Sequence, residues 1–220
     1  MGTLVTEFKN LVAPDVLPCP DPMVNREVIS IMLDFCKKTN ILQRDFELEI
    51  DEDEIDSDLQ NSVDFDISEW SNDLRPVAVL EIMLDANTFI PVARNIRNTH
   101  TAFDGANDER MKYFWIPNDH TIRVFDLTSN LSNIWLNISV KPLRTATEVD
   151  TTLFEDWSEA VVAGAKWKLL SAPGKEWSDP AAGDFYRKEY RKYLSQAKAH
   201  VLRGATGVYQ STVQWKSFGE

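Results

Sequence analysis

Cysteine, histidine and glycine are scarce in this chain of 220 residues. Its only cysteines, Cys19 and Cys36, are too few for a disulfide scaffold or a cysteine-rich metal centre, so we expect reduced thiols in a cytosolic protein. The three histidines, His100, His120 and His200, do not have the spacing of metal ligands. The 8 glycines form no phosphate-binding loop. We expect no metal and no cofactor.

Long hydrophobic runs are also missing. A membrane-spanning helix needs roughly 18 or more consecutive apolar residues, and no segment approaches this length. The first residues, MGTLVTEFKNLVAPD, contain neither a basic leader nor an unbroken apolar run. We therefore expect no signal peptide and no membrane partner.

Basic residues are rare in the middle of the chain. Residues 40–149 hold 9 Lys and Arg against 21 Asp and Glu, so this window accounts for the whole net charge of −12. Such acidity argues against a protein that coats DNA, because phosphate binding needs a cationic surface. Residues 45–66 contain eleven acidic residues and no basic one, which predicts a solvated loop at their centre.

A calcium site in this acidic segment is disfavoured. The stretch DEDEIDSDLQNS, residues 51–62, lacks the glycine at the sixth position and the glutamate at the twelfth that a calcium-binding loop of the EF-hand type requires.

Helical periodicity dominates the first forty residues. Residues 3–12 predict a short amphipathic helix, and the prolines of VAPDVLPCPDP predict an extended arm. Asp21 as the N-cap and Pro22 at the first helical position predict the start of a longer helix, and Asn40 its end. Its apolar face consists of Val24, Val28, Ile31, Met32 and Phe35.

Alternating apolar and polar residues then predict β-strands. The candidates are RDFELEIDED, PVAVLEIML, TFIPVAR, MKYFWIP, HTIRVFDL and NIWLNISVKP. The turn residues at 117–119 predict a hairpin between MKYFWIP and HTIRVFDL. In the last strand, Ile134, Leu136, Ile138 and Val140 face one side.

After Asp150 the period returns to that of a helix. Residues 151–172 and 179–203 predict two helices, the first rich in small residues and the second with Asp179 and Pro180 at its start. The predicted buried face of the second helix consists of Ala182, Phe185, Tyr186, Tyr190, Tyr193, Leu194 and Ala197. The tail GVYQSTVQWKSFGE alternates like a strand but has no neighbouring partner in the sequence.

These elements predict an α+β fold. A single apolar helix face must be covered, so the helix at 21–39 is expected to join the two late helices in an antiparallel bundle. The predicted domains are an N-terminal arm (1–20), the helical bundle (21–40 and 146–204), an inserted β domain (41–145) and a C-terminal arm (205–220).

No catalytic constellation stands out in the sequence. Cys36 shares a helix face with Phe35 and Met32, which favours a buried apolar role over a nucleophilic one. A dyad of His100 with Asp104 has little support beyond the two residue types. We therefore expect a protein that is not an enzyme.

Two tryptophans and a group of basic residues are candidates for binding roles. Trp115 and Trp135 on predicted strands are interpreted as packing residues, with a sugar-binding platform as the alternative. The helix at 179–203 carries a basic face, interpreted either as solvated or as a contact with another subunit. The expected subunit contact within that face consists of Arg187, Lys188, Arg191 and Lys192. Lys198 and Arg203 complete the face, and Asp179, Asp184 and Glu189 are the acidic residues of the same helix.

Two stretches make the chain similar to a known family. They are an arm with CPDP followed by a helix ending FCKKT, and LFEDWSEAVVAGAKWKLLSAPGKEWSDPAAGDFYRKEYRKYLSQAKAHVLRG with a tail ending WKSFGE. In these features, over about residues 13–39 and 134–220, the chain resembles the head-to-tail connectors (adaptors) of tailed phages. The acidic run at 45–66 is not part of the resemblance.

The resemblance implies a structural protein of the virion neck, assembled in the host cytoplasm. Members form a ring, typically of twelve copies, between the portal protein and the tail or nozzle, and DNA passes through the ring without sequence-specific binding. The C-terminal segment commonly grips the portal. In this chain Tyr209, Val213, Trp215 and Phe218 are the expected anchors.

Two alternatives remain open from the sequence. One is another neck or tail-completion ring protein of the virion. The other, from a different class, is a carbohydrate-binding or hydrolytic module that uses the β domain.

Overall fold

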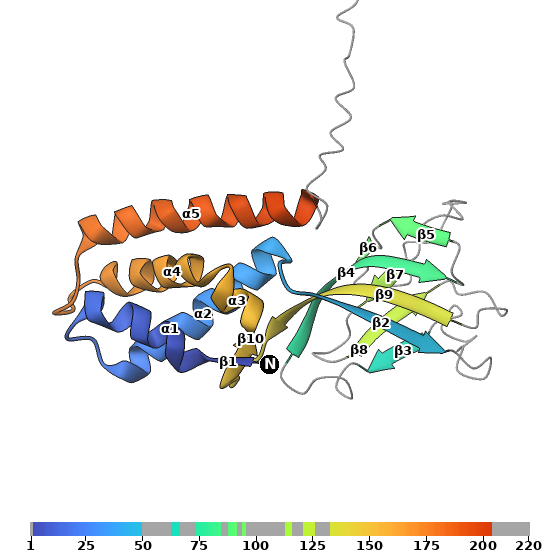
Figure 1. Cartoon of the computed structure of the whole chain (residues 1–220), viewed down its shortest axis with the longest axis horizontal. Helices are drawn as coiled ribbons and strands as arrows, with labels where there is room; N and C mark the ends of the chain where they lie inside the picture. The colour runs from blue at the N-terminus through green and yellow to red at the C-terminus, as the bar shows by residue number, and fades with distance from the viewer. Residues whose placement is uncertain are drawn as a thin grey trace, which may run out of the picture.

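The computed structural model describes residues 2–49, 63–66, 74–84, 88–91, 94–95, 113–115, 121–125 and 133–203. The molecule is elongated, with helices at one end and mainly antiparallel strands at the other (Figure 1). This mixture of helix and sheet agrees with the predicted α+β class.

The chain order begins and ends with helices. The helices are α1 (Val5–Val12), the 3-10 helix η1 (Ala13–Val16), α2 (Asp21–Thr39), α3 (Thr151–Glu155), α4 (Ser158–Leu170) and α5 (Pro180–Arg203). The strands are β1 (Gly2–Leu4), β2 (Gln43–Glu49), β3 (Val63–Asp66), β4 (Leu74–Leu84), β5 (Thr88–Pro91), β6 (Arg94–Asn95), β7 (Tyr113–Trp115), β8 (Thr121–Phe125), β9 (Asn133–Pro142) and β10 (Glu148–Asp150).

The N-terminal arm differs in part from the prediction. The helix expected at 3–12 forms as α1, but Thr3 and Leu4 belong to β1, which pairs with β10. Residues 13–16 form η1 rather than an extended arm. Pro14 is tolerated there because the first turn of a helix has no hydrogen bond for its missing amide to break, and Val16 is buried in the core.

The start of α2 also differs from the prediction, whereas its end does not. Pro20, in extended conformation, is the residue before the helix, and Asp21 is already helical. The Asp21 carboxylate accepts a hydrogen bond from Lys9 Nζ at 2.8 Å instead of capping the helix. Asn40 terminates α2 as predicted, with a left-handed φ of 54° and its N–H bonded to the Cys36 carbonyl.

The packing of α2 places it among the late helices. All five residues of its predicted apolar face are buried, and α2 contacts both α4 and α5. Gly164 of α4 lies where these three helices meet. A Cβ atom there would stand 2.5 Å from Ile31 Cγ2 and 3.0 Å from the Tyr190 ring.

The helix predicted at 151–172 is two helices. The break falls at Asp156 and Trp157, where Trp157 leaves helical geometry with φ −130° and ψ 14°. This bend brings the indole against Phe35 of α2, with ring centroids 5.6 Å apart. The break therefore lets a large side chain pack between α2 and α4.

Helix α5 follows its prediction with one exception. The Asp179 carboxylate caps it by accepting hydrogen bonds from the N–H groups of Ala181 and Ala182. Tyr190 and Ala197 are fully buried, but Phe185 is 58% exposed. Helical spacing alone places Phe185 on the predicted apolar face of this helix. The part of that face that α4 and α2 cover is narrower and does not include Phe185.

The strands in the described ranges form three sheets. Their orders are β2-β9-β4-β5, β3-β8-β7-β6 and β1-β10. Strand β9 is central in the first sheet, and its predicted inward residues, Ile134, Leu136, Ile138 and Val140, are all buried. The predicted hairpin pairing of β7 with β8 is confirmed.

Gly164→Ala is expected to lower the free energy of unfolding by about 1–3 kcal/mol, because overpacking forces neighbours out of their rotamers. Urea denaturation followed by far-UV circular dichroism measures this. Gly183→Ala is the control, since its Cβ would meet mainly the Ser171 hydroxyl, which can rotate. Equal stability of the Gly164 variant and the unaltered protein would contradict the close helix contact.

Candidate interaction surfaces

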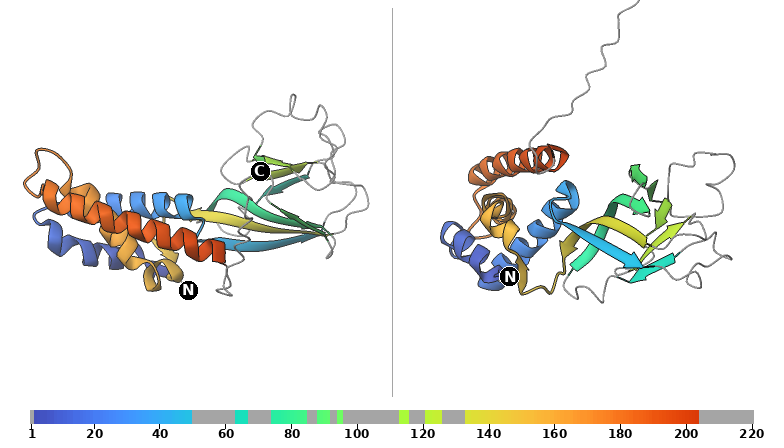
Figure 2. Two further views of the ribbon diagram at one scale, coloured as in Figure 1. Left: turned by 90° about the horizontal axis from the view of Figure 1, so that it is seen from above. Right: turned by 45° about the vertical axis from the view of Figure 1, so that its right-hand side comes forward.

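Helix α5 runs along one side of the helical end (Figure 2). Of its four predicted contact cations, Lys188, Arg191 and Lys192 are exposed and Arg187 is half-buried. Arg187 and Lys188 pair with Asp184 at 2.9 and 3.0 Å, and Lys192 pairs with Glu189 at 3.5 Å. The face therefore carries four cations and two carboxylates.

These pairs change the ionisation of Asp184. The hydrogen bond from Lys188 and the charge of Lys188 hold the pKa of Asp184 below its ordinary value, with smaller contributions from Arg187 and Arg191. Arg187, Lys188 and Lys192 thus pair with carboxylates of their own helix, which fits the interpretation of this face as solvent-exposed. Arg191 is exposed and reaches Asp184 only through its charge.

A shallow groove separates α4 from α5 beside Phe185. Its volume is about 240 Å³, and its walls include Val162, Tyr186 and Tyr193. Tyr193 donates a 2.6 Å hydrogen bond to Glu159, and this bond, with some burial and the nearby negative charge, raises the pKa of Tyr193 to about 12. The groove thus combines an exposed aromatic ring with a fixed carboxylate.

The end of α5 leads into the tail. Leu202, one residue before the last helical residue, is 85% exposed. The predicted portal anchors Tyr209, Val213, Trp215 and Phe218 lie outside the described residues, so their role stays a prediction.

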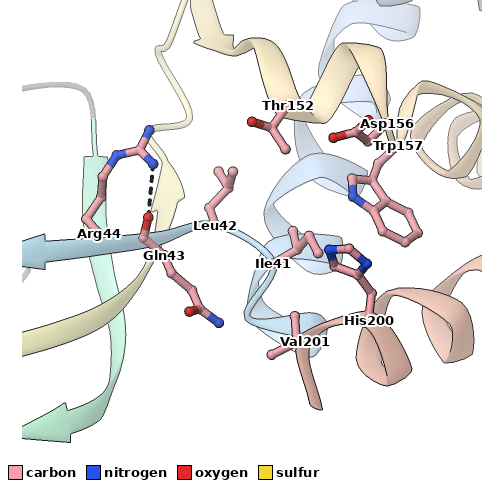
Figure 3. A pocket seen from close by; sticks show the side chains of 9 residues that line it. All are labelled: Ile41, Leu42, Gln43, Arg44, Thr152, Asp156, Trp157, His200 and Val201. Carbon is pink, nitrogen blue, oxygen red and sulfur yellow. Dashed lines mark hydrogen bonds between the residues drawn. The ribbon is translucent and has the colours of Figure 1, made fainter. Parts of the chain in front are cut away.

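A larger pocket, of about 530 Å³, lies where the helices meet the sheet (Figure 3). It is lined by Ile41, Leu42, Gln43, Arg44, Thr152, Asp156, Trp157, His200 and Val201. The His200 imidazole lies beside the Trp157 indole, with ring centroids 6.0 Å apart. Among these described lining residues there is one imidazole and one carboxylate, and neither a cysteine nor a serine.

The cysteines are unsuited to nucleophilic chemistry. Cys36 is fully buried, and burial raises the pKa of its thiol to about 12. Burial also raises the pKa of Cys19, helped by the charges of Asp21 and Glu27. A thiol needs a lowered pKa to react, so Cys36 has the buried apolar role that the sequence predicted.

The other predicted chemical candidates are mostly outside the described residues. This holds for His100, Asp104, His120, the acidic stretch at 51–62 and the side chain of Trp115. Trp135 is half-buried in β9, opposite Glu47 and Met83 in the neighbouring strands. Within the part of the chain that is described, no cluster of metal ligands occurs, and no helix has the length and apolar character to cross a membrane.

An ion pair joins the sheet to the helices. Arg44 of β2 binds the carboxylate of Asp150, which also accepts a 2.9 Å hydrogen bond from the Thr152 N–H at the start of α3. Burial opposes ionisation of Asp150, but the hydrogen bonds from Thr152 and Arg44 outweigh it and lower its pKa. One carboxylate therefore caps a helix and anchors a strand.

Sequence reasoning missed a cationic groove on the other side of α2. A hollow of about 400 Å³ is lined by Ser30, Leu33, Asp34, Lys37, Arg75, Lys141, Pro142, Leu143, Arg144 and Thr145. Its four basic residues come from three separate parts of the sequence, α2, β4 and the end of β9 with the following turn. No local run of charge could have indicated it.

Two comparisons with known proteins, one with family models and one with curated sequences, found no match for this chain.

Asp150→Asn is expected to destabilise the protein by about 1 kcal/mol at neutral pH, as for a lost surface ion pair and a weakened cap. Because folding lowers the pKa of Asp150, its contribution is present above the unfolded value of about 3.9 and is lost as pH falls through the folded value. Urea denaturation at pH 7 and pH 3 should show the difference from the unaltered protein shrinking. Glu148→Gln, at an exposed position nearby, is the control at pH 7 and should lower the free energy of unfolding less than Asp150→Asn does. A difference for Asp150→Asn that stays constant between the two pH values would contradict the assignment.

Proposed function

We propose that this chain is a head-to-tail connector of a tailed phage. In this role about twelve copies form a ring between the portal protein and the tail, and DNA passes through the ring without sequence-specific binding. The protein would be a structural component of the virion neck and not an enzyme.

The helical packing carries the proposal, because the motifs of the resemblance have packing roles there. Trp157, in LFEDW, packs on Phe35, and Gly164, in AVVAGAKW, permits the approach of Ile31 and Tyr190. Asp179, in WSDP, caps α5. The motif residues are thus those that build this helical core.

A second support is the path of the chain, which leaves the helices and returns to them at one place. The chain leaves α2 at Asn40 and returns through β9 and β10 to α3. The outgoing and returning segments lie side by side: the Val140 N–H donates to the Leu42 carbonyl at 2.9 Å, and the Ser139 hydroxyl bonds to Asn40 at 3.0 Å. Adjacent entry and exit points are what an insertion requires.

The C-terminal arm is proposed to bind the portal by strand addition. Its sequence alternates like a strand, and an extended segment can pair with a sheet edge of another chain. Leu202, at the end of α5, is exposed, and the arm follows this helix in the sequence. Tyr209, Val213, Trp215 and Phe218 would fill pockets of the portal, as buried aromatic residues dominate many interfaces.

The outer face of α5 is proposed as a contact between neighbouring copies in the ring. Arg187, Lys188 and Lys192 have carboxylate partners within the helix, so exposed Arg191 is the cation with most to contribute across an interface. Exposed ion pairs are worth under about 1 kcal/mol. The contact would therefore determine which surfaces of two subunits meet, and it would add little to the affinity between them.

Deleting residues 205–220 is expected to leave the fold intact and to abolish portal attachment. A pull-down with purified portal protein measures attachment, and circular dichroism checks the fold. Replacing Tyr209, Trp215 and Phe218 by alanine in the full chain should have the same effect. Full retention of the truncated chain on the portal would refute the role of the arm.

Arg191→Glu combined with Lys192→Glu is expected to reduce ring formation on the portal severalfold, because it reverses the charge of the proposed contact. Electron microscopy of the mixed particles counts complete rings. Lys168→Glu with Lys175→Glu is the control with equal charge change at exposed sites outside α5. Equal numbers of rings with both variants would assign the α5 cations to a solvated face.

A further inference from the structure

The cationic groove on α2 is the feature that the proposed function leaves unexplained. Lys37 lies in the last turn of α2, Arg75 and Lys141 are paired opposite each other in β4 and β9, and Arg144 follows β9. Asp34 is the one carboxylate among the described residues that line the groove. It is already engaged, by Lys38 at 2.7 Å and by the Tyr190 hydroxyl at 3.0 Å.

Three of these cations have no carboxylate partner among the residues that the structure describes. Within the described ranges, no ion pair involves Lys37, Lys141 or Arg144. Elsewhere in the helical end, cations such as Lys9, Lys38 and Lys166 do have acidic partners. A concave site that gathers unpaired positive charge is suited to an anionic ligand.

The groove continues along α2. A second hollow, of about 310 Å³, is lined by Arg26, Glu27, Ile29, Ser30, Leu33 and Arg144, so the two share Ser30, Leu33 and Arg144. In the second hollow, Arg26 pairs with Glu27. An elongated anionic segment therefore fits the groove better than a single small anion does.

The chain itself contains a segment of the required chemistry. Residues 51–58, DEDEIDSD, carry six carboxylates and no cation. A chain with net charge −12 repels the phosphates of DNA at long range, whereas a second copy brings both a cationic groove and an acidic segment. Charge complementarity thus favours a second copy over DNA as the source of the anion.

The position of the groove favours a second copy over the same copy. Arg75, Lys141 and Gln43 lie at the helix end of the first sheet. Strand β2 runs from Gln43 to Glu49, so its far end lies about 20 Å along the sheet from Gln43. The point at which segment 51–58 is attached is therefore remote from the groove of the same copy.

We propose that the α2 groove, formed around Lys37, Arg75, Lys141 and Arg144, binds the acidic segment 51–58 of a neighbouring copy of this chain. Each copy offers one groove and one segment, so the contact is head-to-tail and generates a ring if its rotation closes. This inference rests on the proposed function, since it specifies how copies of the connector contact one another.

The direct test uses a fluorescent peptide of residues 49–62 and the full-length chain. Anisotropy should show binding that weakens from 50 to 300 mM salt, as expected for an electrostatic contact. Lys141→Glu with Arg144→Glu should weaken binding about tenfold. The control Lys175→Glu with Lys198→Glu changes the net charge equally, and equal binding by the two variants would overturn the proposal.

Charge exchange between copies tests whether the contact is intermolecular. One chain carries Lys141→Glu and Arg144→Glu, and the other carries lysine at Asp51, Glu52, Asp53 and Glu54. Sedimentation velocity should show less self-association for each alone and recovery in their mixture. Association unchanged in each separate variant would overturn the proposal in favour of a contact within one copy.

Two further outcomes are decisive. A labelled DNA duplex that binds the groove more tightly than the peptide, with the same loss in the groove variant, would overturn the proposal in favour of a nucleic-acid site. Failure of the unaltered chain to bind portal protein, with peptide binding intact, would instead overturn the connector function and leave the contact between copies standing.

Discussion

The close meeting of α2, α4 and α5 is the contact on which the rest of the structure depends. Gly164 leaves no room for a side chain between Ile31 and Tyr190, and the Tyr190 hydroxyl donates to Asp34 across the same contact. Burial and the Asp34 charge raise the pKa of Tyr190, so the phenol stays protonated and remains a donor. A buried hydroxyl with a fixed acceptor also selects one arrangement of the helices among many apolar ones.

This contact joins segments from both ends of the sequence, and the strands must therefore leave and return at one place. Two hydrogen bonds hold the outgoing and returning segments together there. The Val140 N–H donates to the Leu42 carbonyl, and the Ser139 hydroxyl donates to the Asn40 side chain. The Arg44–Asp150 pair ties β2 to the start of α3. The helical end and the sheet end are thus connected by a short set of polar contacts, with the pocket of Figure 3 beside them.

Charge is unevenly distributed over the molecule. The acidic excess belongs to residues 40–149, and the remainder of the chain is balanced. Cations nevertheless collect on α5 and around the groove on α2. In the proposed ring, such an asymmetric molecule would place opposite charges in contact at every interface, which would favour one order of assembly over others.

Much of the local structure followed from the sequence alone. The apolar face of α2, the inward residues of β9, the left-handed Asn40 and the Asp179 cap were all predictable, because each depends on the spacing or stereochemistry of nearby residues. The tertiary structure decided what depends on distant partners. Asp21 does not cap α2 because Lys9 binds it, the helix after Asp150 breaks because Trp157 packs on Phe35, and Phe185 is exposed because its neighbours cover a narrower stripe. The groove of Lys37, Arg75, Lys141 and Arg144 exists only once three distant segments fold together, since electrostatic potential depends on distance in space and not on separation along the chain.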